Sequence, residues 1–200
     1  MQLKGENLSF RYGKDDYIFK DINIEINRGD RVGLVAKSGR GKSTLAKVLA
    51  GYEEPSQGCV LVDGKPISKK GYNPVQLIYQ HPEKSINPRW RMKDVLEESG
   101  PINWELIKAM GIEEDWMTRY PTELSGGELQ RFAVCRALNG KTEFLIADEV
   151  STMLDVITQA QIWNVILEQA RILNLGMLIV THNTHLAQKV CTRIVELEKL

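Results

Sequence analysis

The sequence predicts a mixed α/β fold in which helices flank a parallel sheet, with an antiparallel β subdomain near the N-terminus and a small helical insertion. Three observations predict it. Short apolar segments such as "RVGLV", "FLIAD" and "GMLIV" alternate with helical segments, which is typical of a parallel sheet covered on both faces. Alternating polarity and turn residues dominate the first third of the chain. A proline-punctuated stretch of helical character interrupts the alternating pattern.

The first 80 residues predict strands around one helix. Residues 42–51, "KSTLAKVLAG", carry apolar side chains at helical spacing and offer Gly51 as a C-cap. Asp63 and Gly64 predict a turn that closes a strand. Four segments have the short apolar or alternating pattern of strands: residues 22–26, 31–35, 59–67 and 75–79.

Residues 81–140 predict a compact helical subdomain, because helical runs are separated there by prolines at positions 82, 88, 101 and 121. Residues 1–80 and 141–200 then form the core of a single domain that spans residues 1–200. The later part of this core predicts a buried strand over 142–149, a helix over 158–173, a strand over 176–182, and a closing helix and strand.

Composition limits the function classes. The chain has 200 residues, of which 42% are hydrophobic and 26% charged, and its formal net charge is zero. We therefore expect a soluble globular protein without the overall basic field that recruits nucleic acid. The longest apolar runs are far shorter than the roughly 20 residues that span a membrane. Cys59, Cys135 and Cys191 lack C-x-x-C spacing, which favours a reducing compartment and buried, inert thiols.

The stretch "AKSGRGKSTL", residues 36–45, links a predicted strand to a predicted helix and predicts a phosphate-binding loop. Gly39 and Gly41 permit a close approach of the backbone to phosphates, and the helix dipole favours an anion there. Lys42 can reach the β- and γ-phosphates, while Ser43 can ligate Mg²⁺ and Thr44 can reach the α-phosphate. The alternative is a glycine turn capped by Ser43. The expected nucleotide-binding residues of this loop are Lys37, Ser38, Gly39, Arg40, Gly41, Lys42, Ser43 and Thr44.

Ala36 stands where the pattern G-x-x-x-x-G-K-[ST] places its first glycine. An alanine at positive φ would cost about 1–2 kcal/mol, whereas an extended alanine would cost little. Because the backbone donors of residues 37–44 are intact, we expect a negative φ at Ala36, close to extended, and a working loop.

The strand "FLIADE" ends in Asp148 and Glu149, which we expect beside the phosphate-binding loop at the carboxyl edge of the sheet. Asp148 would hold Mg²⁺ through water, and Glu149 would polarise the water that attacks the γ-phosphate. An acidic pair after a strand also fits a solvated turn. The assignment therefore depends on the neighbouring loop.

The segment "LSGGELQR", residues 124–131, resembles the signature motif of the ATP-binding cassette ATPases, which have a P-loop NTPase core. Its two glycines precede a predicted helix and so give a second anion-binding helix N-terminus. The resemblance implies a head-to-tail dimer in which the P-loop of one protomer and Ser125, Gly126 and Gly127 of the other enclose ATP. The alternative is a structural N-cap at Ser125 followed by a glycine turn.

Further positions match the family's motifs in order along the chain. Tyr12 in "SFRYG" resembles the aromatic residue that stacks on adenine, and Gln80 in "IYQHP" resembles the glutamine that senses Mg²⁺ and water. Asp155 in "STMLD" resembles the aspartate that crosses the dimer interface, and His182 in "VTHN" resembles the switch histidine at the γ-phosphate. Taken singly, Tyr12 also fits a core aromatic and His182 a loop histidine. The resemblance implies catalytic roles for Gln80, Glu149 and His182, and Mg²⁺ ligation by Ser43, Gln80 and Asp148.

Two segments resemble the dipeptide, oligopeptide and nickel importer ATPases within this family: "HPEKSINPRWRM" and "LDVITQAQIWNVI". Ordinary divergence could also produce them. Departures from the family pattern remove no group that does chemistry, so they bear on turnover more than on ATP binding. These departures are Ala36, Glu128, Val150, Met153 and Asn183.

The resemblance implies an ATP-hydrolysing subunit that drives solute import, with a peptide or nickel as the solute. It implies transmembrane permease subunits, a second cassette in a homo- or heterodimer and, indirectly, a solute-binding protein as partners, with no nucleic acid. The implied location is cytoplasmic, peripheral on the inner face of the cell membrane. Two alternatives remain open. One is a catalytically weak regulatory cassette, which Ala36 and Val150 favour but Glu149 and His182 argue against, and the other is a soluble cassette outside transport.

Overall fold

The computed structural model describes residues 1–36, 39–138, 140–150 and 154–197. Its central element is a five-stranded sheet with the strand order β6-β7-β8-β3-β9, in which every paired strand is parallel to its neighbour. The parallel sheet that the sequence predicts is therefore confirmed. Its strands are β3 (Arg31–Val35), β6 (Val75–Ile78), β7 (Phe144–Asp148), β8 (Gly176–Val180) and β9 (Arg193–Glu196).

A second sheet is antiparallel and has the order β2-β1-β4-β5. Asp63 and Gly64 both have positive φ, 50° and 72°, as a two-residue hairpin turn requires. The chain therefore reverses where the sequence predicts a turn, and the segment predicted as a strand over 59–67 contains parts of two paired strands on either side of that turn. The strands of this sheet are β1 (Gln2–Phe10), β2 (Phe19–Asn27), β4 (Gln57–Val62) and β5 (Lys65–Pro66).

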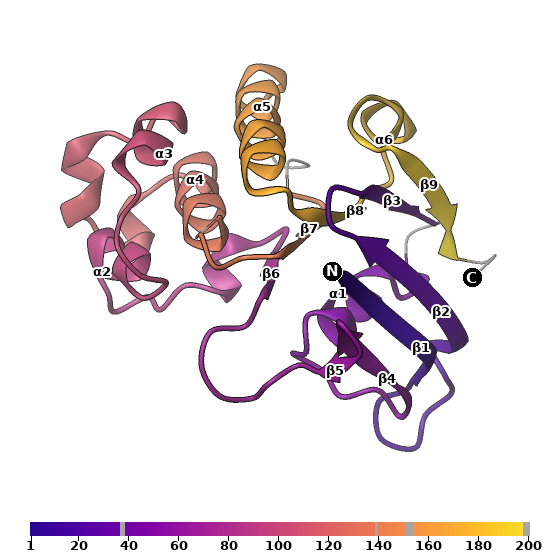
Figure 1. The fold of residues 1–200 in the computed structure, drawn as a ribbon. Helices are drawn as coiled ribbons and strands as arrows, with labels where there is room; N and C mark the ends of the chain where they lie inside the picture. The colour runs from indigo at the N-terminus through magenta and orange to yellow at the C-terminus, as the bar shows by residue number, and fades with distance from the viewer. Residues whose placement is uncertain (37–38, 139, 151–153, 198–200) are drawn as a thin grey trace.

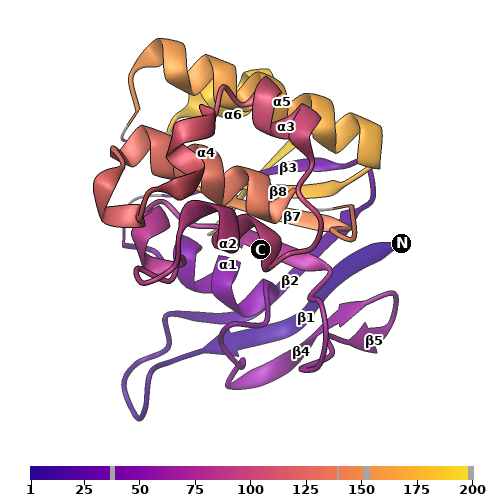
Figure 2. The ribbon, with the colours of Figure 1, turned by 90° about the vertical axis from the view of Figure 1, so that its left-hand side faces the viewer.

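Helices cover both faces of the parallel sheet in the two views (Figure 1, Figure 2). Helices α5 and α6 lie on one side, whereas α1 lies on the other side, between the two sheets. The α-helices are α1 (Lys42–Leu49), α2 (Met92–Glu97), α3 (Trp104–Ala109), α4 (Gly126–Ala137), α5 (Val156–Leu173) and α6 (Thr184–Val190). Short 3-10 helices are η1 (Pro82–Lys84), η2 (Glu114–Thr118) and η3 (Pro121–Glu123).

Successive residues of β7 and β8 contribute to different apolar clusters, because side chains alternate between the faces of a strand. Leu145 and Ile179 belong to a cluster with α4 and α5. Ile146 and Leu178 belong to a second cluster with α1 and the antiparallel sheet. Both faces of the parallel sheet are thus buried, which explains why these strands read as continuous apolar runs.

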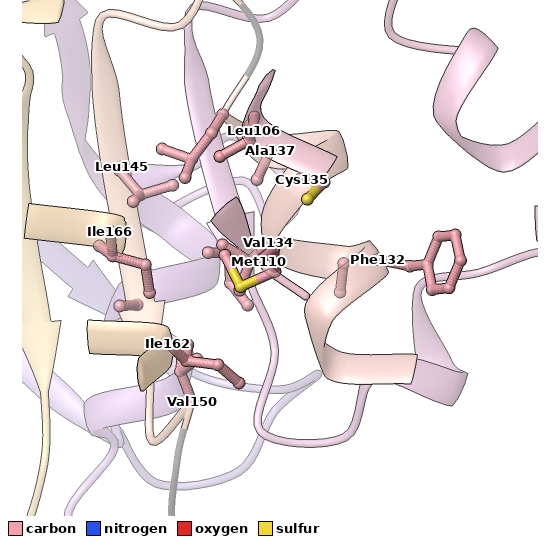
Figure 3. Close-up of a cluster of buried hydrophobic side chains, with 14 of the residues drawn as sticks. Leu106, Met110, Phe132, Val134, Cys135, Ala137, Leu145, Val150, Ile162 and Ile166 are labelled. Atoms are coloured by element: carbon pink, nitrogen blue, oxygen red, sulfur yellow. The ribbon is translucent and has the colours of Figure 1, made fainter. Parts of the chain in front are cut away.

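The helical insertion shares its apolar cluster with the parallel sheet. Val134 on α4 lies in one cluster with Leu145 of β7 and Ile162 of α5, and Met110 at the end of α3 joins it (Figure 3). Helix α4 therefore fastens the insertion to the sheet. The boundary of a helical subdomain at residues 81–140 stays a prediction.

The expectation that the three cysteine thiols are buried has a different outcome at each position. Cys135 is buried, and burial raises the pKa of its thiol; burial also raises the pKa of the half-buried Cys191 to about 11. Cys59 is exposed, so the expectation of a buried thiol is wrong there. The reason is that β4 belongs to the antiparallel sheet, and its first residues are exposed.

Among the helices in the described ranges, none has the length and apolar character of a membrane-spanning segment.

Candidate active site

A cleft of about 430 Å³ opens at the carboxyl edge of the parallel sheet, where β3, β6 and β7 end and α1 begins. Parallel strands all end at the same edge, so the loops that follow them meet there. The cleft gathers five of the eight predicted residues of the phosphate-binding loop and two of the three residues predicted to be catalytic. Its lining residues are Ile18, Gly39, Gly41, Lys42, Ser43, Thr44, Gln80 and Glu149.

The N-terminus of α1 faces this cleft, and no side chain among the described residues caps it. Gly41 is the N-cap residue, with a φ of 88°, and the first turn contains no acidic residue. A Cβ at Gly41 would lie 2.5 Å from Cγ2 of Ile18, so the position requires glycine for space as well as for φ. The alternative in which Ser43 caps the helix is therefore wrong. The first backbone N–H groups of α1 are arranged to receive an anion.

Lys42 is 6% exposed, and its Nζ donates a hydrogen bond to the backbone carbonyl of Ala36 at 2.7 Å. The buried ammonium group of Lys42, at the start of α1, is therefore hydrogen-bonded to the first residue of the loop. Ala36 is absent from the described non-glycine residues with positive φ, so the predicted sign of its φ is confirmed. Arg40 is exposed, and Lys37 and Ser38 lie outside the described residues.

Asp148 is 6% exposed and accepts a hydrogen bond from the Ser43 side chain. Burial raises the pKa of its carboxyl, the Ser43 hydrogen bond opposes that rise, and the nearby Glu149 adds to it. Its Oδ1 is buried without a hydrogen-bond partner among the described residues. Such an oxygen is costly unless a ligand satisfies it. A hydroxyl and a carboxylate side by side are the hard oxygen donors that suit Mg²⁺.

Asp148→Asn is expected to raise the thermal unfolding midpoint of the nucleotide-free protein while lowering Mg²⁺-dependent ATP hydrolysis at least about tenfold. An amide keeps the shape and the acceptor for Ser43 but has no charge to desolvate. A gain of about 1 kcal/mol would appear as about 2–4 °C for a domain of this size. Scanning calorimetry and phosphate-release assays measure the two effects.

The pH dependence of this gain has a definite sign. Because the folded-state pKa of Asp148 is raised, its carboxyl favours folding when protonated and loses that contribution as the pH rises through the folded pKa. The advantage of Asn over Asp at position 148 should therefore be largest near neutral pH and shrink toward about pH 4. An unchanged midpoint at neutral pH would contradict the assignment of a strained, buried charge.

Glu149 has a φ of 48°, an unusual conformation for a non-glycine residue. Its backbone N–H donates to the Val180 carbonyl at 2.9 Å, so β8 holds the turn in place. Its Oε1 lies 3.1 Å from Nδ1 of His182, which follows β8. Gln80 follows β6 and lines the same cleft. The three residues predicted to be catalytic thus follow three neighbouring strands, and the turn at β7 directs Glu149 toward the cleft.

The β1–β2 loop contributes a residue that the sequence reasoning missed. Ile18 lines the cleft beside Gly41, whereas the predicted adenine-stacking Tyr12 is absent from the described lining. Tyr12 is 46% exposed, and its ring meets Phe10 edge-on at 4.9 Å. Its role in adenine binding stays a prediction. An apolar residue just before a strand gives no sequence signal for a site, so Ile18 could not have been found from the pattern.

The signature motif lies at a different place. Ser125 is the N-cap of α4 and forms a capping box with Glu128: Ser125 N–H donates to Glu128 Oε2 at 2.6 Å, and Glu128 N–H donates to Ser125 Oγ at 3.3 Å. Gly126, the first residue of α4, is exposed. A second cleft of about 270 Å³ adjoins this end of the helix. Its lining residues are Trp116, Ser125, Gly127, Glu128, Arg131, Leu154, Asp155 and Thr158.

Asp155 belongs to this second cleft and is the N-cap of α5, where it accepts from the backbone N–H groups of Ile157 and Thr158 at 3.0 Å each. Hydrogen bonds from the Thr158 side chain and backbone lower the pKa of its carboxyl. This cap also explains why α5 begins at Val156, ahead of the predicted residue 158. The described linings of the two clefts share no residue. The chain therefore carries two separate clefts, one beside the N-terminus of α1 and one beside the N-terminus of α4.

Comparisons with known proteins identify the family. The sequence matches the family model described as ABC transporter over residues 19–152. It is 31% identical over 207 residues to the nickel import system ATP-binding protein NikE of Staphylococcus aureus (strain MSSA476), a match that covers 96% of this chain and 85% of that protein. It is 32% identical over 218 residues to the dipeptide transport ATP-binding protein DppF of Lactococcus lactis subsp. cremoris (strain MG1363), covering 97% of this chain and 70% of that protein.

Solved structures share the fold. The dimeric post-hydrolysis state of the ATP-binding cassette MJ0796 bound to ADP and Pi has a TM-score of 0.82 at 22% identity, covering 97% of this chain and 93% of that chain. The structure of cbiO1 from Clostridium perfringens, part of the ABC transporter complex cbiONQ, has a TM-score of 0.78 at 25% identity, covering 97% and 83%. The family match spans well over half of the sequence, and the curated relatives exceed 30% identity over nearly all of it. The chain therefore belongs to the ABC transporter family, as an ATP-binding and ATP-hydrolysing subunit.

Proposed function

We propose that this chain drives solute import by closing head-to-tail with a second cassette around ATP, in contact with transmembrane permease subunits. The observation that carries the proposal is the separation of the two clefts, because neither contains all the groups that a phosphoryl-transfer site needs. A second cassette turned head-to-tail would place its signature cleft over the P-loop cleft of this chain. That cassette is a second copy or a paralogue.

The residues of the P-loop cleft have distinct roles in this proposal. The α1 N-terminus and Lys42 bind the phosphates of ATP, and the adenine stacks on Tyr12. Ser43, Asp148 and Gln80 would hold Mg²⁺, which neutralises phosphate charge when bound. The buried Oδ1 of Asp148, which has no hydrogen-bond partner in the described part of the chain, supports this role.

Hydrolysis requires a proton acceptor beside the γ-phosphate. Glu149 accepts the proton of the attacking water, and His182, 3.1 Å from Glu149, orients that carboxylate and contacts the γ-phosphate. Ser125, Gly126 and Gly127 of the second cassette complete the phosphate site, and Asp155 crosses to the partner from the start of α5. Phosphate contacts present only before hydrolysis hold the closed state, and their loss opens the dimer.

Import as the direction, and a peptide or nickel as the solute, rest on the relatives named for nickel import and dipeptide transport. A solute-binding protein would deliver the solute to the permeases, and the cassette would lie peripherally on the inner face of the membrane through those permeases.

The proposal is tested by co-expressing the tagged chain with the permease subunits proposed as its partners. Affinity capture from detergent-solubilised membranes should recover the permeases. Vesicles that contain the complex should take up a labelled peptide or ⁶³Ni only when ATP is supplied on the cassette side. If the chain is recovered without permeases and hydrolyses ATP at the same rate in their presence and absence, a role outside transport replaces this proposal.

A further inference from the structure

Helix α4 contacts the segment around Gln80 at two points. We define the Gln80 loop as residues 79–85. From α4, Gln130 donates through Nε2 to the carbonyl of Tyr79 at 3.4 Å, and Arg136 donates through Nη1 to the carbonyl of Ser85 at 2.7 Å. The two donors lie six residues apart on the helix, about 9 Å along its axis. They hold the two ends of the loop, with Gln80 between them.

Both contacts are sheltered from solvent. Gln130 is 2% exposed, and the side chain of Arg136 is 18% exposed. Arg136 also lies 3.5 Å from Glu98, the residue that follows α2, so its guanidinium joins three segments. A charge-assisted hydrogen bond in such a setting is stronger than one between neutral groups and is screened little by salt.

The Gln80 loop is itself compact. Lys84 N–H donates to the His81 carbonyl at 3.1 Å, and Ser85 donates to the Pro82 carbonyl through both its N–H and its Oγ at 3.0 Å. Pro82 is buried in the same region. Residues 81–85, which directly follow Gln80, therefore form a short, hydrogen-bonded turn.

The same helix begins at the signature motif. Ser125 is the N-cap of α4, and the capping box with Glu128 ties the Ser125 backbone to the first turn of the helix. One element thus carries the signature residues at its start and holds the Gln80 loop farther along. The backbone on both sides of Gln80 is thus hydrogen-bonded to the helix that carries the signature residues.

We propose that Arg136, assisted by Gln130, is a positioning residue that couples Gln80 in the P-loop cleft to the signature end of the same chain. This inference rests on the proposed function, because it assumes that Gln80 responds to ATP and that the signature completes a partner's site. Arg136 touches neither ATP nor the attacking water in this scheme. It transmits the state of one nucleotide site to the surface that completes the other.

Arg136→Met tests the coupling, because methionine fills a similar space and donates no hydrogen bond. In the full chain, alone and with its permeases, the kcat for ATP hydrolysis should fall at least tenfold. The affinity of the isolated chain for ATP and the KM should change less than threefold. Arg136→Lys keeps a charged donor and should restore much of the kcat. Glu98→Gln removes the ion pair but leaves the Ser85 contact, so it is the matched control and should behave as the wild type.

A distance measurement separates coupling from stability. Spin labels at the exposed positions Lys108 on α3 and Lys189 on α6, with the exposed Cys59 replaced by serine, report the helical insertion against the sheet. Saturating Mg-ATP should shift this distance in the wild type, Arg136→Lys and Glu98→Gln, but not in Arg136→Met. Should Arg136→Met fold poorly, Gln130→Leu probes the Tyr79 contact in the same assay and should also reduce the shift.

The outcomes are distinct. A wild-type kcat and a wild-type shift in Arg136→Met would overturn the inference while leaving the proposed function intact. If Arg136→Met lowers both the ATP affinity and the unfolding midpoint, and Arg136→Lys does not restore them, Arg136 has a purely structural role and the inference is also overturned. A wild-type chain that binds no ATP, or shows no ATP-dependent shift, would overturn the proposed function and this inference with it.

Discussion

Glu149→Gln is expected to retain ATP binding and to lose turnover by about a hundredfold or more, the usual contribution of a general base. Glutamine has nearly the same shape, can still hydrogen-bond His182, and leaves the Val180 contact of the backbone unchanged. It cannot accept the proton of the attacking water. Calorimetry with ATP and a phosphate-release assay measure the two quantities separately.

The same variant should accumulate the closed dimer, because the contacts that hold it are lost only after hydrolysis. Light scattering in Mg-ATP should show a dimer, either of the variant alone or of its mixture with a partner cassette. Glu168→Gln, on the exposed side of α5, removes the same charge elsewhere and should leave turnover unchanged. Only monomer both in the variant alone and in its mixture with the partner cassette would contradict the sandwich mechanism. Retained turnover would contradict the role of Glu149 as the base.

Lys42→Ala is expected to weaken ATP binding at least tenfold, about 1.4 kcal/mol. The ammonium is 6% exposed and already held at the mouth of α1 by the Ala36 carbonyl, so it meets the phosphates with little reorganisation. A charge in such a shielded position attracts an anion more strongly than one in bulk water. Calorimetry measures the affinity.

Lys189→Ala, an exposed lysine on α6, is the control for a change in net charge and should leave the affinity unaltered. Thermal unfolding of Lys42→Ala without nucleotide checks that the fold persists. Equal affinities in Lys42→Ala and the wild type would remove Lys42 from the phosphate site.

The sequence by itself determined the elements whose patterns are local. The strand–loop–helix around Lys42 could be predicted because a buried strand has a continuous apolar run, and a phosphate loop needs glycines at fixed offsets from a lysine. The turn at Asp63 and Gly64 follows from the ease with which these residues adopt positive φ. Ser125 at a helix start follows from the hydrogen bond that a serine oxygen offers to the first free N–H groups.

Only the tertiary structure decided which of these elements meet. Three contacts join residues that lie 23 to 51 positions apart in the sequence. They are Glu149 with His182, Ile18 with Gly41, and Arg136 with Ser85. Helical and strand periodicities report which face of one element is apolar, but they carry no information on the partner of a polar group across the fold. The same limit explains why the sequence did not reveal that Cys59 is exposed, since free cysteines are commonly buried. The separation of the P-loop and signature clefts arises in the same way, since the packing of α4 against β6, α2 and α5 decides where Ser125 lies.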